Sequence, residues 1–426
     1  MTQPAAFLGM RGTGDFTVTG QRPENWREMV LKLYPNGSAP LTALLARMKN
    51  EKTDDPKFHW FETELPDQTG TVTGVFGGTN LSDAYAGTVV GDTFYVKMSA
   101  AHAAKFNLSH QVMLAVHAQP SVRLVAKVSV APVINGASSY VTCILLQADT
   151  TSTTGAAIHA AVAAGASMLV IGSVNSEGGT SPTAMMYDPE ELNSYTQIFR
   201  TSLDSTRTAM KTRLRTGDQV KEAKAQALEL HSIEQEKAYW FSYLSLRTGS
   251  NGKPERTTKG IRNYLSTNVL DYPQTTSATW AQGGKLFFDS FIEQVCRFGN
   301  TEKTCFAGNG ALLGIQQMVE NNAQMNITPG VAAFGIKVVK LETVFGTLNI
   351  LRHPLFTNNP LLRYSMGVLD LPYLVYRFID DTKYLPNRQT PDLDGEKSEF
   401  LTEAGLEVHF EKAHGWLDGV GLDGAL

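Results

Sequence analysis

The sequence predicts an α+β fold with more than one domain. After residue 190, segments with helical and strand patterns follow each other without strict alternation, which favours α+β over α/β architecture. The chain has 426 residues, whereas one domain usually contains about 100–200, so two or three domains are expected. A hydrophobic content of 42% and a charged content of 18% exclude a chain that is disordered throughout.

The first 50 residues predict an arm with two short helices. Residues 1–20 are rich in Gly and Thr and show no periodicity. Pro23 opens the first helix, where its missing N–H loses no hydrogen bond, and residues 40–48 form the second. The apolar side chains at helical spacing are Trp26, Met29, Val30 and Leu33 in the first helix and Leu41, Leu44, Leu45 and Met48 in the second.

The next segment, PKFHWFETELP at residues 56–66, predicts a strand with bulky side chains on both faces. Phe58 and Trp60 alternate with His59 and Phe61. A single domain rarely exposes two aromatic faces. The strand is therefore expected either at the centre of a sheet or in contact with another chain.

Residues 70–182 predict a β-rich insertion. Gly, Thr, Ser and Ala dominate this stretch, and turn residues separate five segments with strand character. Both a small barrel and a long hairpin with additional strands fit this pattern. The strands are expected within 87–98, 110–117, 121–130, 139–148 and 167–174.

A long helix is predicted over residues 219–241, with further helices over 189–218. The stretch QVKEAKAQALELHSIEQEKAYWF contains neither Gly nor Pro, and Asp218 is a suitable N-cap. At 1.5 Å per residue, this helix is about 35 Å long. Its apolar stripe is narrow and rich in Ala, which suits close packing on a sheet or helix and not a free-standing coiled coil.

Beyond residue 248 the sequence predicts a basic loop, two helices and several strands. The loop, broken by Gly and Pro, covers residues 249–265. The remaining elements are helices at 285–299 and 308–322, a hairpin at 335–356, and strands within 367–379 and 399–420.

The sequence shows no recognisable catalytic constellation. Walker, GxSxG and HExxH motifs are absent, and the nine His residues are scattered without metal-binding partners. Asp392, Asp394 and Glu396 surround a Gly but do not follow the calcium-binding EF-hand pattern, so a solvated turn is the simpler interpretation. We therefore expect no enzyme activity, no metal and no cofactor.

Cysteines and charge give weaker indications. Cys143, Cys296 and Cys305 form no CxxC pair and are expected to be free thiols in a reducing compartment. Neither a signal peptide nor a transmembrane helix is expected. The net charge is −4, but residues 200–224 contain seven Lys or Arg against three Asp or Glu, and residues 370–426 contain five against twelve. Two solvated surfaces are the plain interpretation of this unevenness.

Seven segments carry a family resemblance through their order. They are RPENWREMVLKLYPNGSAPLTALLARM at 22–48, FHWFETELP at 58–66, EELNSYTQIFRTSLDSTRTA at 190–209, EKAYWF at 236–241, ERTTKGIRNYL at 255–265, and the segments 335–356 and 399–420. In this order they resemble tailed-bacteriophage major capsid (major head) proteins with the Hong Kong 97 fold, which encapsulins share. The resemblance covers residues 10–65 and 185–420, and residues 70–182 match least.

The resemblance implies a division of the chain into five parts. These are an N-terminal arm, 1–60; an extended loop with an inserted β-rich subdomain, 61–190; a P domain, 191–274, with a spine helix, 218–241; an axial domain, 275–350; and return strands of the axial and P domains, 351–426.

The resemblance also implies a structural function. The chain would be a major capsid subunit, without enzyme activity, that assembles into the hexamers and pentamers of an icosahedral shell around double-stranded DNA. Its partners would be its own copies, a portal protein, decoration or scaffold proteins, and packaged DNA bound non-specifically, without a membrane. The location would be the virion capsid, assembled in the host cytoplasm.

Particular residues are expected to carry this function. Interface candidates are Trp26, Phe58, Trp60 and Phe61, and lumen-facing basic candidates are Arg213 and Arg215. Three alternatives stay open: an encapsulin-like compartment shell, an enzyme without a recognisable motif, and a decoration or tail protein.

Overall fold

The computed structural model describes residue 41 and residues 49–85, 87, 89–117, 119–148, 165–212, 218–321, 327–331 and 337–424. The chain forms two compact units: the body, Met1–Glu62 with Glu191–Leu426, and the barrel unit, Thr63–Glu190. Helices and strands are mixed along the chain, so the predicted α+β class is confirmed. None of the helices within the described residues is long and apolar enough to span a membrane.

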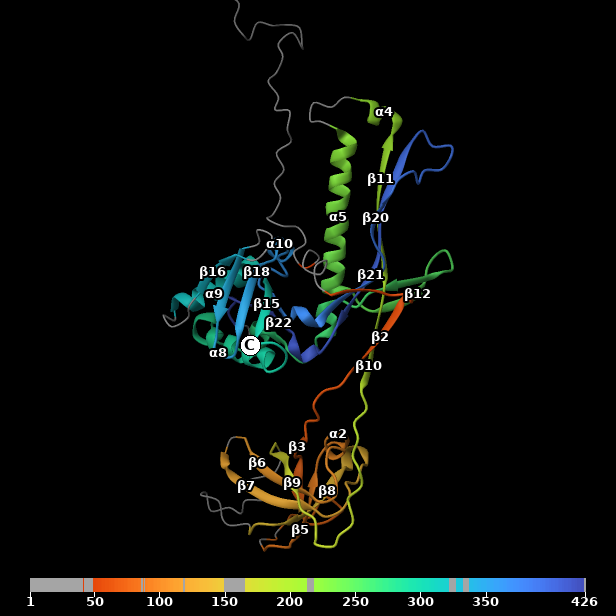
Figure 1. Ribbon diagram of the computed structural model, residues 1–426. Coiled ribbons are helices and arrows are strands. Elements are labelled where there is room, and N and C mark those ends of the chain that lie inside the picture. Colours follow the sequence, from red (N-terminus) through yellow and green to blue (C-terminus); the bar gives the residue numbers. More distant parts are fainter. Residues whose placement is uncertain are drawn as a thin grey trace, which may run out of the picture. The chain divides into compact units, whose positions relative to one another are not determined.

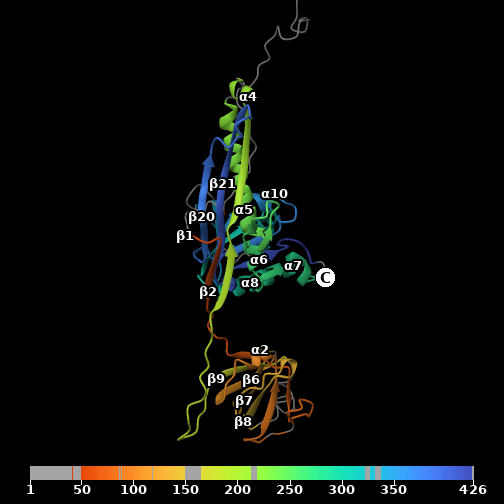
Figure 2. The same cartoon turned by 90° about the vertical axis from the view of Figure 1, so that its right-hand side faces the viewer.

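The first sheet of the body has four strands in the order β1-β20-β21-β11, and helix α5 lies along one of its faces (Figure 1 and Figure 2). Strands β11 and β21 are antiparallel over ten residue pairs, from Gln197 opposite Ala404 to Thr206 opposite Gly395. The bounds are Asn50–Lys52 for β1, Gln197–Thr206 for β11, Leu374–Leu385 for β20 and Gly395–Val408 for β21.

Helix α5 covers Gln219–Phe241, which confirms the predicted long helix. The Asp218 carboxylate accepts hydrogen bonds from N–H groups of the first turn, so the predicted N-cap is also confirmed. Midway along the helix, the ring nitrogens of His231 lie 2.9 Å from Thr201 Oγ1 and 2.8 Å from Thr402 Oγ1. The helix is thereby attached to both β11 and β21.

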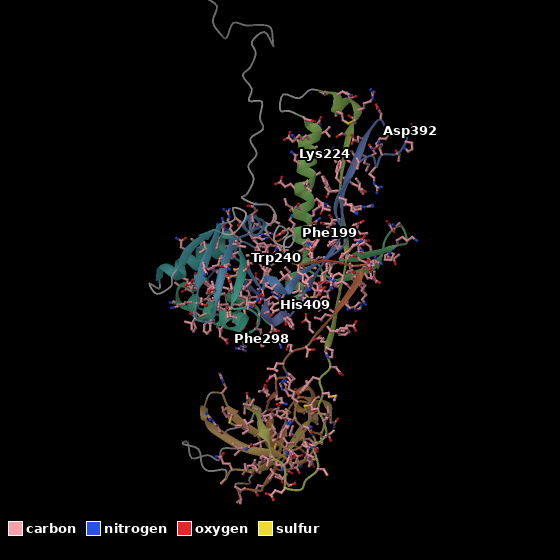
Figure 3. All side chains as sticks on the ribbon, viewed as in Figure 1. Phe199, Lys224, Trp240, Phe298, Asp392 and His409 are labelled. Carbon is pink, nitrogen blue, oxygen red and sulfur yellow. The ribbon has the colours of Figure 1, made fainter. Side chains whose placement is uncertain are left out.

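The prediction of helices over residues 189–218 is wrong for most of this segment. Its described residues, 189–212 and 218, form strand β10, Glu190–Tyr195, strand β11, and a short helix, α4, at Arg207–Lys211. Burial alternates along β11, where Phe199 points towards α5 and Arg200 is exposed (Figure 3). The segment is extended because β21 pairs with it, and β21 lies far along the chain.

The second sheet of the body has seven strands, and helices α8 and α9 pack on it. Helices α8, Trp280–Cys296, and α9, Asn309–Asn321, confirm both predicted helices, and β17 and β18 confirm the predicted hairpin. The strand order is β14 (Val269–Asp271), β22 (Gly415–Asp418), β19 (Met366–Leu369), β15 (Glu302–Ala307), β18 (Thr347–Arg352), β17 (Lys337–Glu342) and β16 (Ile327–Val331).

The remaining elements of the body are short. The segment expected to be one strand at 367–379 is split between β19 and β20 by a 3₁₀ turn, η3 at Leu371–Tyr373. The others are β2 (Lys57–Glu62), β12 (Ser245–Thr248), β13 (Pro254–Thr257), α6 (Ile261–Tyr264), α7 (Tyr272–Thr275), α10 (Pro354–Asn358) and η4 (Glu411–Ala413).

Trp240, at the end of α5, joins the two sheets of the body (Figure 3). Its side chain is fully buried, and its ring centroid lies 5.5 Å from that of Phe306, 5.1 Å from Phe356 and 5.7 Å from Trp416. Gly367 permits this contact, because a Cβ there would lie 2.8 Å from the indole. The aromatic end of α5 therefore closes the helix into the core.

The barrel unit confirms the barrel alternative for residues 70–182. Its sheet order is β3-β9-β6-β7-β8-β5-β4, and β3 and β4 are the two halves of one extended segment. The Val72 N–H donates to the Ala166 carbonyl at 2.8 Å on one side, and the Thr73 N–H donates to the Lys97 carbonyl at 2.8 Å on the other. This segment therefore joins both edges of the sheet and closes it.

Alternate side chains of the barrel strands point into one apolar core. Among them are Val112 and Leu114 of β6, which are 0% exposed. The bounds are β3 Thr69–Thr71, β4 Gly74–Phe76, β5 Thr93–Lys97, α2 Ala100–Ala103, β6 His110–Val116, β7 Gln119–Val128, η1 Gly136–Ser138, β8 Tyr140–Leu145 and β9 Ser167–Ser173.

Candidate inter-subunit site

A two-stranded ribbon of β2 and β10 has one buried face and one exposed face. Phe58 and Trp60 are each 6% exposed, and their stacked rings are 6.1 Å apart. Phe61, the residue after Trp60 and on the opposite face, is 68% exposed. The two aromatic faces expected from the sequence are present, and the structure covers one of them with the chain's own core.

Hydrogen bonds fix this ribbon to the body. The Trp60 indole N–H donates to Glu62 Oε1 at 2.8 Å, and the same oxygen accepts from the Phe410 N–H at 3.0 Å. On the exposed face, His59 Nδ1 lies 2.6 Å from Glu191 Oε1. Phe61 is therefore presented to solvent by a strand whose backbone is held in place.

An ionic network lies behind the ribbon. Glu407, whose side chain is 3% exposed, accepts from Arg377 Nε at 2.5 Å and lies 2.7 Å from His409 Nε2. Burial raises the pKa of Glu407, but the hydrogen bonds from His409 and Arg377 outweigh it and lower that pKa below its usual value. Arg377 also pairs with Glu51 of β1. The network joins β1, β20 and β21.

A groove lies between the β12–β13 hairpin and the start of β11. Its volume is about 320 Å³, and Ile198, Lys253 and Arg256 are among its lining residues. Every residue of β12 is exposed, and Tyr243, just before it, is 74% exposed. The hairpin is held at its base, where the Thr258 N–H donates to Gln197 Oε1 at 3.2 Å, while β12 faces solvent.

The remaining sequence candidates have different outcomes. Trp26, Arg213 and Arg215 lie outside the described residues. Of the basic stretch that is described, Lys211 is exposed on α4, and Arg207 Nε lies 2.7 Å from Asp394 Oδ1. The pair thus engages Asp394, one carboxylate of the acidic turn 392–396 at the start of β21. Asp392 of the same turn is labelled in Figure 3.

The fully buried charged groups are bound internally. Lys303 Nζ donates to the Phe298 and Ala413 carbonyls, each at 2.8 Å, and lies 3.2 Å from Asp370 Oδ2. Burial lowers the pKa of Lys303, and the Asp370 carboxylate opposes that shift. Asp370 Oδ2 also accepts from the Asn300 N–H at 2.7 Å. These groups are saturated by protein partners, which suits a structural role.

A second buried pair anchors the N-terminal segment. Glu236 Oε1 lies 2.8 Å from His353 Nε2 and accepts from the Leu41 N–H at 3.0 Å. Leu41 is 0% exposed and belongs to the apolar core of the body. Glu236 thus links α5 to Leu41 and to the start of α10.

The described part of the chain shows no candidate metal site. No group of three or more His, Cys, Asp or Glu there has metal-binding geometry. Cys143, Cys296 and Cys305 are free thiols, and burial raises the pKa of all three. The features that stand out are surfaces: the ribbon with Phe61 and the hairpin groove.

A family model, that of the SU10 major capsid protein, matches residues 12–421 of the chain. The chain belongs to the SU10 major capsid protein family. A curated relative of this capsid-family chain is the major capsid protein of Pseudomonas phage PaMx41, with 28% identity over 232 residues. The alignment covers 53% of the chain and 55% of that relative, so the chain spans about half the length of the curated relative it matches.

Solved structures similar to this capsid-family chain are distant. One, of Microbacterium phage Oxtober96, has a TM-score of 0.43 and 9% identity and covers 93% of this chain and 95% of that one. The encapsulin SrpI of Synechococcus elongatus PCC 7942 has a TM-score of 0.39 and 12% identity over 56% and 77% of the two chains. Membership of the family therefore rests on the family match over residues 12–421.

Proposed function

We propose that the chain is the major capsid subunit of a tailed bacteriophage and assembles into an icosahedral shell around double-stranded DNA. The family match over residues 12–421 carries this proposal. The exposed hairpin and the exposed Phe61 support it, because both are surfaces that a second copy can cover. Hexamers and pentamers are the capsomers that such a shell requires, and the chain acts without catalysis.

The domain roles are proposed from the observed elements. Helix α5 would be the spine of a P domain at 191–274, and the sheet with α8 and α9 would form the axial domain at 275–350 together with return strands from 351–426. The barrel unit would be the inserted subdomain of the extended loop, 61–190. The division of the chain at Glu62/Thr63 and Glu190/Glu191 supports the last assignment.

The interface candidates differ in how directly they could contact a neighbouring copy. Among the interface candidates that the structure describes, Phe61 has an exposed side chain, whereas Phe58 and Trp60 lie in the chain's own core. Phe61 is therefore the proposed direct contact, and Phe58 and Trp60 would act by holding the ribbon. Trp26 keeps its proposed role as part of the arm, residues 1–60, lying on a neighbouring copy.

The basic stretch 200–224 is proposed to face the lumen. Arg213 and Arg215 would contact DNA phosphates without reading sequence, and the described Lys211 and Arg200 are exposed beside them in the chain. A portal protein and decoration or scaffold proteins are the further partners proposed. The virion capsid would be the location, after assembly in the host cytoplasm.

Electron microscopy of the purified chain tests the proposal. The expected result is closed shells with five- and six-fold capsomers. A monodisperse monomer at high concentration under every assembly condition would overturn it. Shells that form around a protein cargo, and exclude DNA when both are offered, would favour a compartment shell instead.

A further inference from the structure

The dipeptide Asn-Gly occurs four times in the chain, beginning at residues 36, 135, 251 and 309. In this dipeptide, the asparagine side chain and the following backbone nitrogen can close a five-membered ring, because glycine places no side chain over that nitrogen. The reaction needs an open and adaptable backbone, so the folded structure decides which pair reacts. Asn36 lies outside the described residues, and the other three pairs have different surroundings.

The pair Asn251–Gly252 lies at the tip of the hairpin formed by β12 and β13. Both residues are exposed. Gly252 has a φ of +72°, and apart from its chain neighbours no atom lies within 4 Å of the position that a Cβ would take there. The rest of the protein therefore does not obstruct the approach of the Gly252 nitrogen to the side chain of Asn251.

A backbone group polarises the amide of Asn251. The Lys253 N–H donates to Asn251 Oδ1 at 3.0 Å. When a nucleophile attacks Cγ of Asn251, negative charge develops on this oxygen, and a donor that is already in place stabilises that charge. The turn thus holds Asn251 with an activated side-chain carbonyl.

One hydrogen bond opposes the reaction. The Gly252 N–H donates to the Gly249 carbonyl at 3.0 Å, and this proton must be removed before the nitrogen can attack. Local opening of the hairpin tip releases it. Every residue of β12 is exposed, and segments with exposed backbone hydrogen bonds and few buried contacts open at a low cost in free energy.

The pair Asn309–Gly310 provides the contrast. Gly310 is buried at the start of α9, and a Cβ there would lie 2.6 Å from the ring of Tyr364. Thr357 Oγ1 donates to Asn309 Oδ1 at 3.3 Å. Ring closure at this pair would require α9 to separate from the residues packed on it, so the folded chain protects Asn309.

The pair Asn135–Gly136, in the barrel unit, lies between these two cases. It is exposed, and the space around Gly136 is as open as that around Gly252. However, the side chain of Asn135 accepts no capping hydrogen bond from the short helix η1 that follows it. Its amide carbonyl lacks the activating donor that Asn251 has, so we expect it to react more slowly.

We propose that Asn251 is a site of spontaneous deamidation. The Gly252 nitrogen forms a bond to Cγ of Asn251, the Cγ–Nδ2 bond breaks, and ammonia leaves with the proton of the Gly252 N–H, so that a succinimide remains. Water then opens this ring at either of its carbonyls and gives aspartate or isoaspartate. The inference is independent of the proposed function, because the reaction takes place within a single chain.

Deamidation changes both the charge and the backbone of the hairpin. Residues 243–262 contain five Lys or Arg against the single Glu255, and the product adds a second carboxylate at residue 251. Isoaspartate also inserts an extra carbon into the backbone, which disturbs the hydrogen bond of 2.8 Å from the Gly249 N–H to the Lys253 carbonyl. Since Asn251 lines the hairpin groove, that groove becomes less basic without a change of gene sequence.

Peptide mapping by mass spectrometry tests the site. The full chain is incubated in mildly alkaline buffer, where deamidation raises the mass of a peptide by about 1 Da, because NH₂ is replaced by OH. Trypsin releases residues 248–256, which contain Asn251 as their one Asn. In the folded chain, Asn251 should convert at least about tenfold faster than Asn309, and faster than Asn135. In concentrated urea the three should convert at similar rates, since the same dipeptide is then exposed everywhere.

Substitutions at the hairpin tip isolate the chemistry. Gly252→Ala shields the attacking nitrogen with a methyl group and should slow the conversion of Asn251 at least about tenfold, both in buffer and in urea. Ser250→Ala, on the other side of Asn251, leaves the dipeptide intact and should convert within about twofold of the parent rate. Circular dichroism checks that both variants fold as the parent does.

Two results would overturn the proposal. One is an Asn251 peptide of unchanged mass in the folded chain while the same peptide converts in urea. The other is conversion of Asn309 as fast as Asn251 in the folded chain, because the fold would then not direct the reaction. Faster conversion of Asn135 than of Asn251 would reject the activating role of the Lys253 N–H. Failure of the chain to build shells bears on the proposed function alone.

Discussion

The body and the barrel unit stabilise their cores in different ways. In the described part of the barrel unit, the buried polar side chains are Ser139 and Thr142, and no Asp, Glu, Lys, Arg or His is buried. The body buries Glu236, Lys303 and Asp370 at about 0–1% exposure, each with a partner of opposite charge or a His. The described barrel core is thus apolar, whereas the body core combines its apolar clusters with charges that must meet their partners.

This difference indicates which kind of substitution should destabilise each unit most. Replacing a buried ion pair by apolar groups is often neutral, whereas removing one partner leaves an uncompensated charge. The barrel has no such point, so its stability depends on filling its core. The barrel unit, residues 63–190, contains no Trp, whereas the described Trp60, Trp240, Trp280 and Trp416 belong to the body. Tryptophan fluorescence therefore follows the body alone.

The largest effect is expected for Asp370→Ala in the body. Lys303 would keep its charge without a carboxylate, so the free energy of unfolding should fall by about 3–5 kcal/mol. Urea unfolding followed by tryptophan fluorescence measures the change. The paired variant Lys303→Met/Asp370→Leu should lose clearly less. Equal losses in the single and paired variants would contradict a stabilising role of the charge pairing.

A core deletion in the barrel should give a somewhat smaller effect, confined to that unit. Leu114→Ala removes a side chain that is 0% exposed and should destabilise the barrel by about 3 kcal/mol. Hydrogen exchange of the barrel strands should accelerate, while the tryptophan unfolding curve stays unchanged. Leu169→Ala, at a site 36% exposed on the paired strand β9, is the matched control with a small effect. A shift of the tryptophan curve by Leu114→Ala would show that the two units unfold together.

Acid should weaken the body through His414. Burial lowers the pKa of His414 to about 4, with the hydrogen bond to the His409 carbonyl opposing the shift. Since the unfolded chain binds this proton below about pH 6.5 and the folded chain does not, stability is lost as pH falls from 6.5 to 4, by up to about 3 kcal/mol.

The His414→Gln variant isolates this contribution. Glutamine can still accept from the Asp370 N–H and donate to the His409 carbonyl, the two bonds of the imidazole, but it does not titrate. Its fluorescence-detected stability should therefore decline less between pH 6.5 and 4 than that of the parent. An identical decline would assign the acid sensitivity to other groups.

The smallest effect on subunit stability, with a large one on assembly, is expected for Phe61→Ser. The side chain is 68% exposed, so the free energy of unfolding should change by less than about 0.5 kcal/mol. If Phe61 meets a neighbouring copy, shell formation should drop sharply, since aromatic contacts of this kind often contribute about 2 kcal/mol or more. Shells with normal yield and stability would remove Phe61 from the interface.

The sequence predicts best those elements whose signal is local. Helix α5 has no Gly or Pro and an Asp cap, and the five barrel strands follow turn residues and alternation. The sequence alone does not predict strand β11. Its alternation, with Phe199 buried and Arg200 exposed, becomes recognisable only when β21 is known to pair with it. Barrel closure depends in the same way on the pairing of Val72 with Ala166 and Thr73 with Lys97.

The candidate site is predictable only in part. Alternation at Phe58 to Phe61 predicts two bulky faces, but which face the chain covers depends on Tyr264 and other distant residues that pack on Trp60. The sequence predicts only a basic broken loop at 249–265, because the groove forms where β13 contacts β11, which is distant in sequence. Buried charges such as Lys303 give no sequence signal, since their partners are far along the chain.

The pairing of strands β2 and β10 determines where this chain can accept a foreign segment. The chain leaves the body at Glu62 and returns at Glu191, and these two crossing points lie on neighbouring strands of one ribbon. Because the ends of the intervening segment start side by side, a foreign domain with adjacent termini could replace residues 63–190 without threading through the body's core. A peptide inserted there would leave the strand pairing of the body's sheets unchanged.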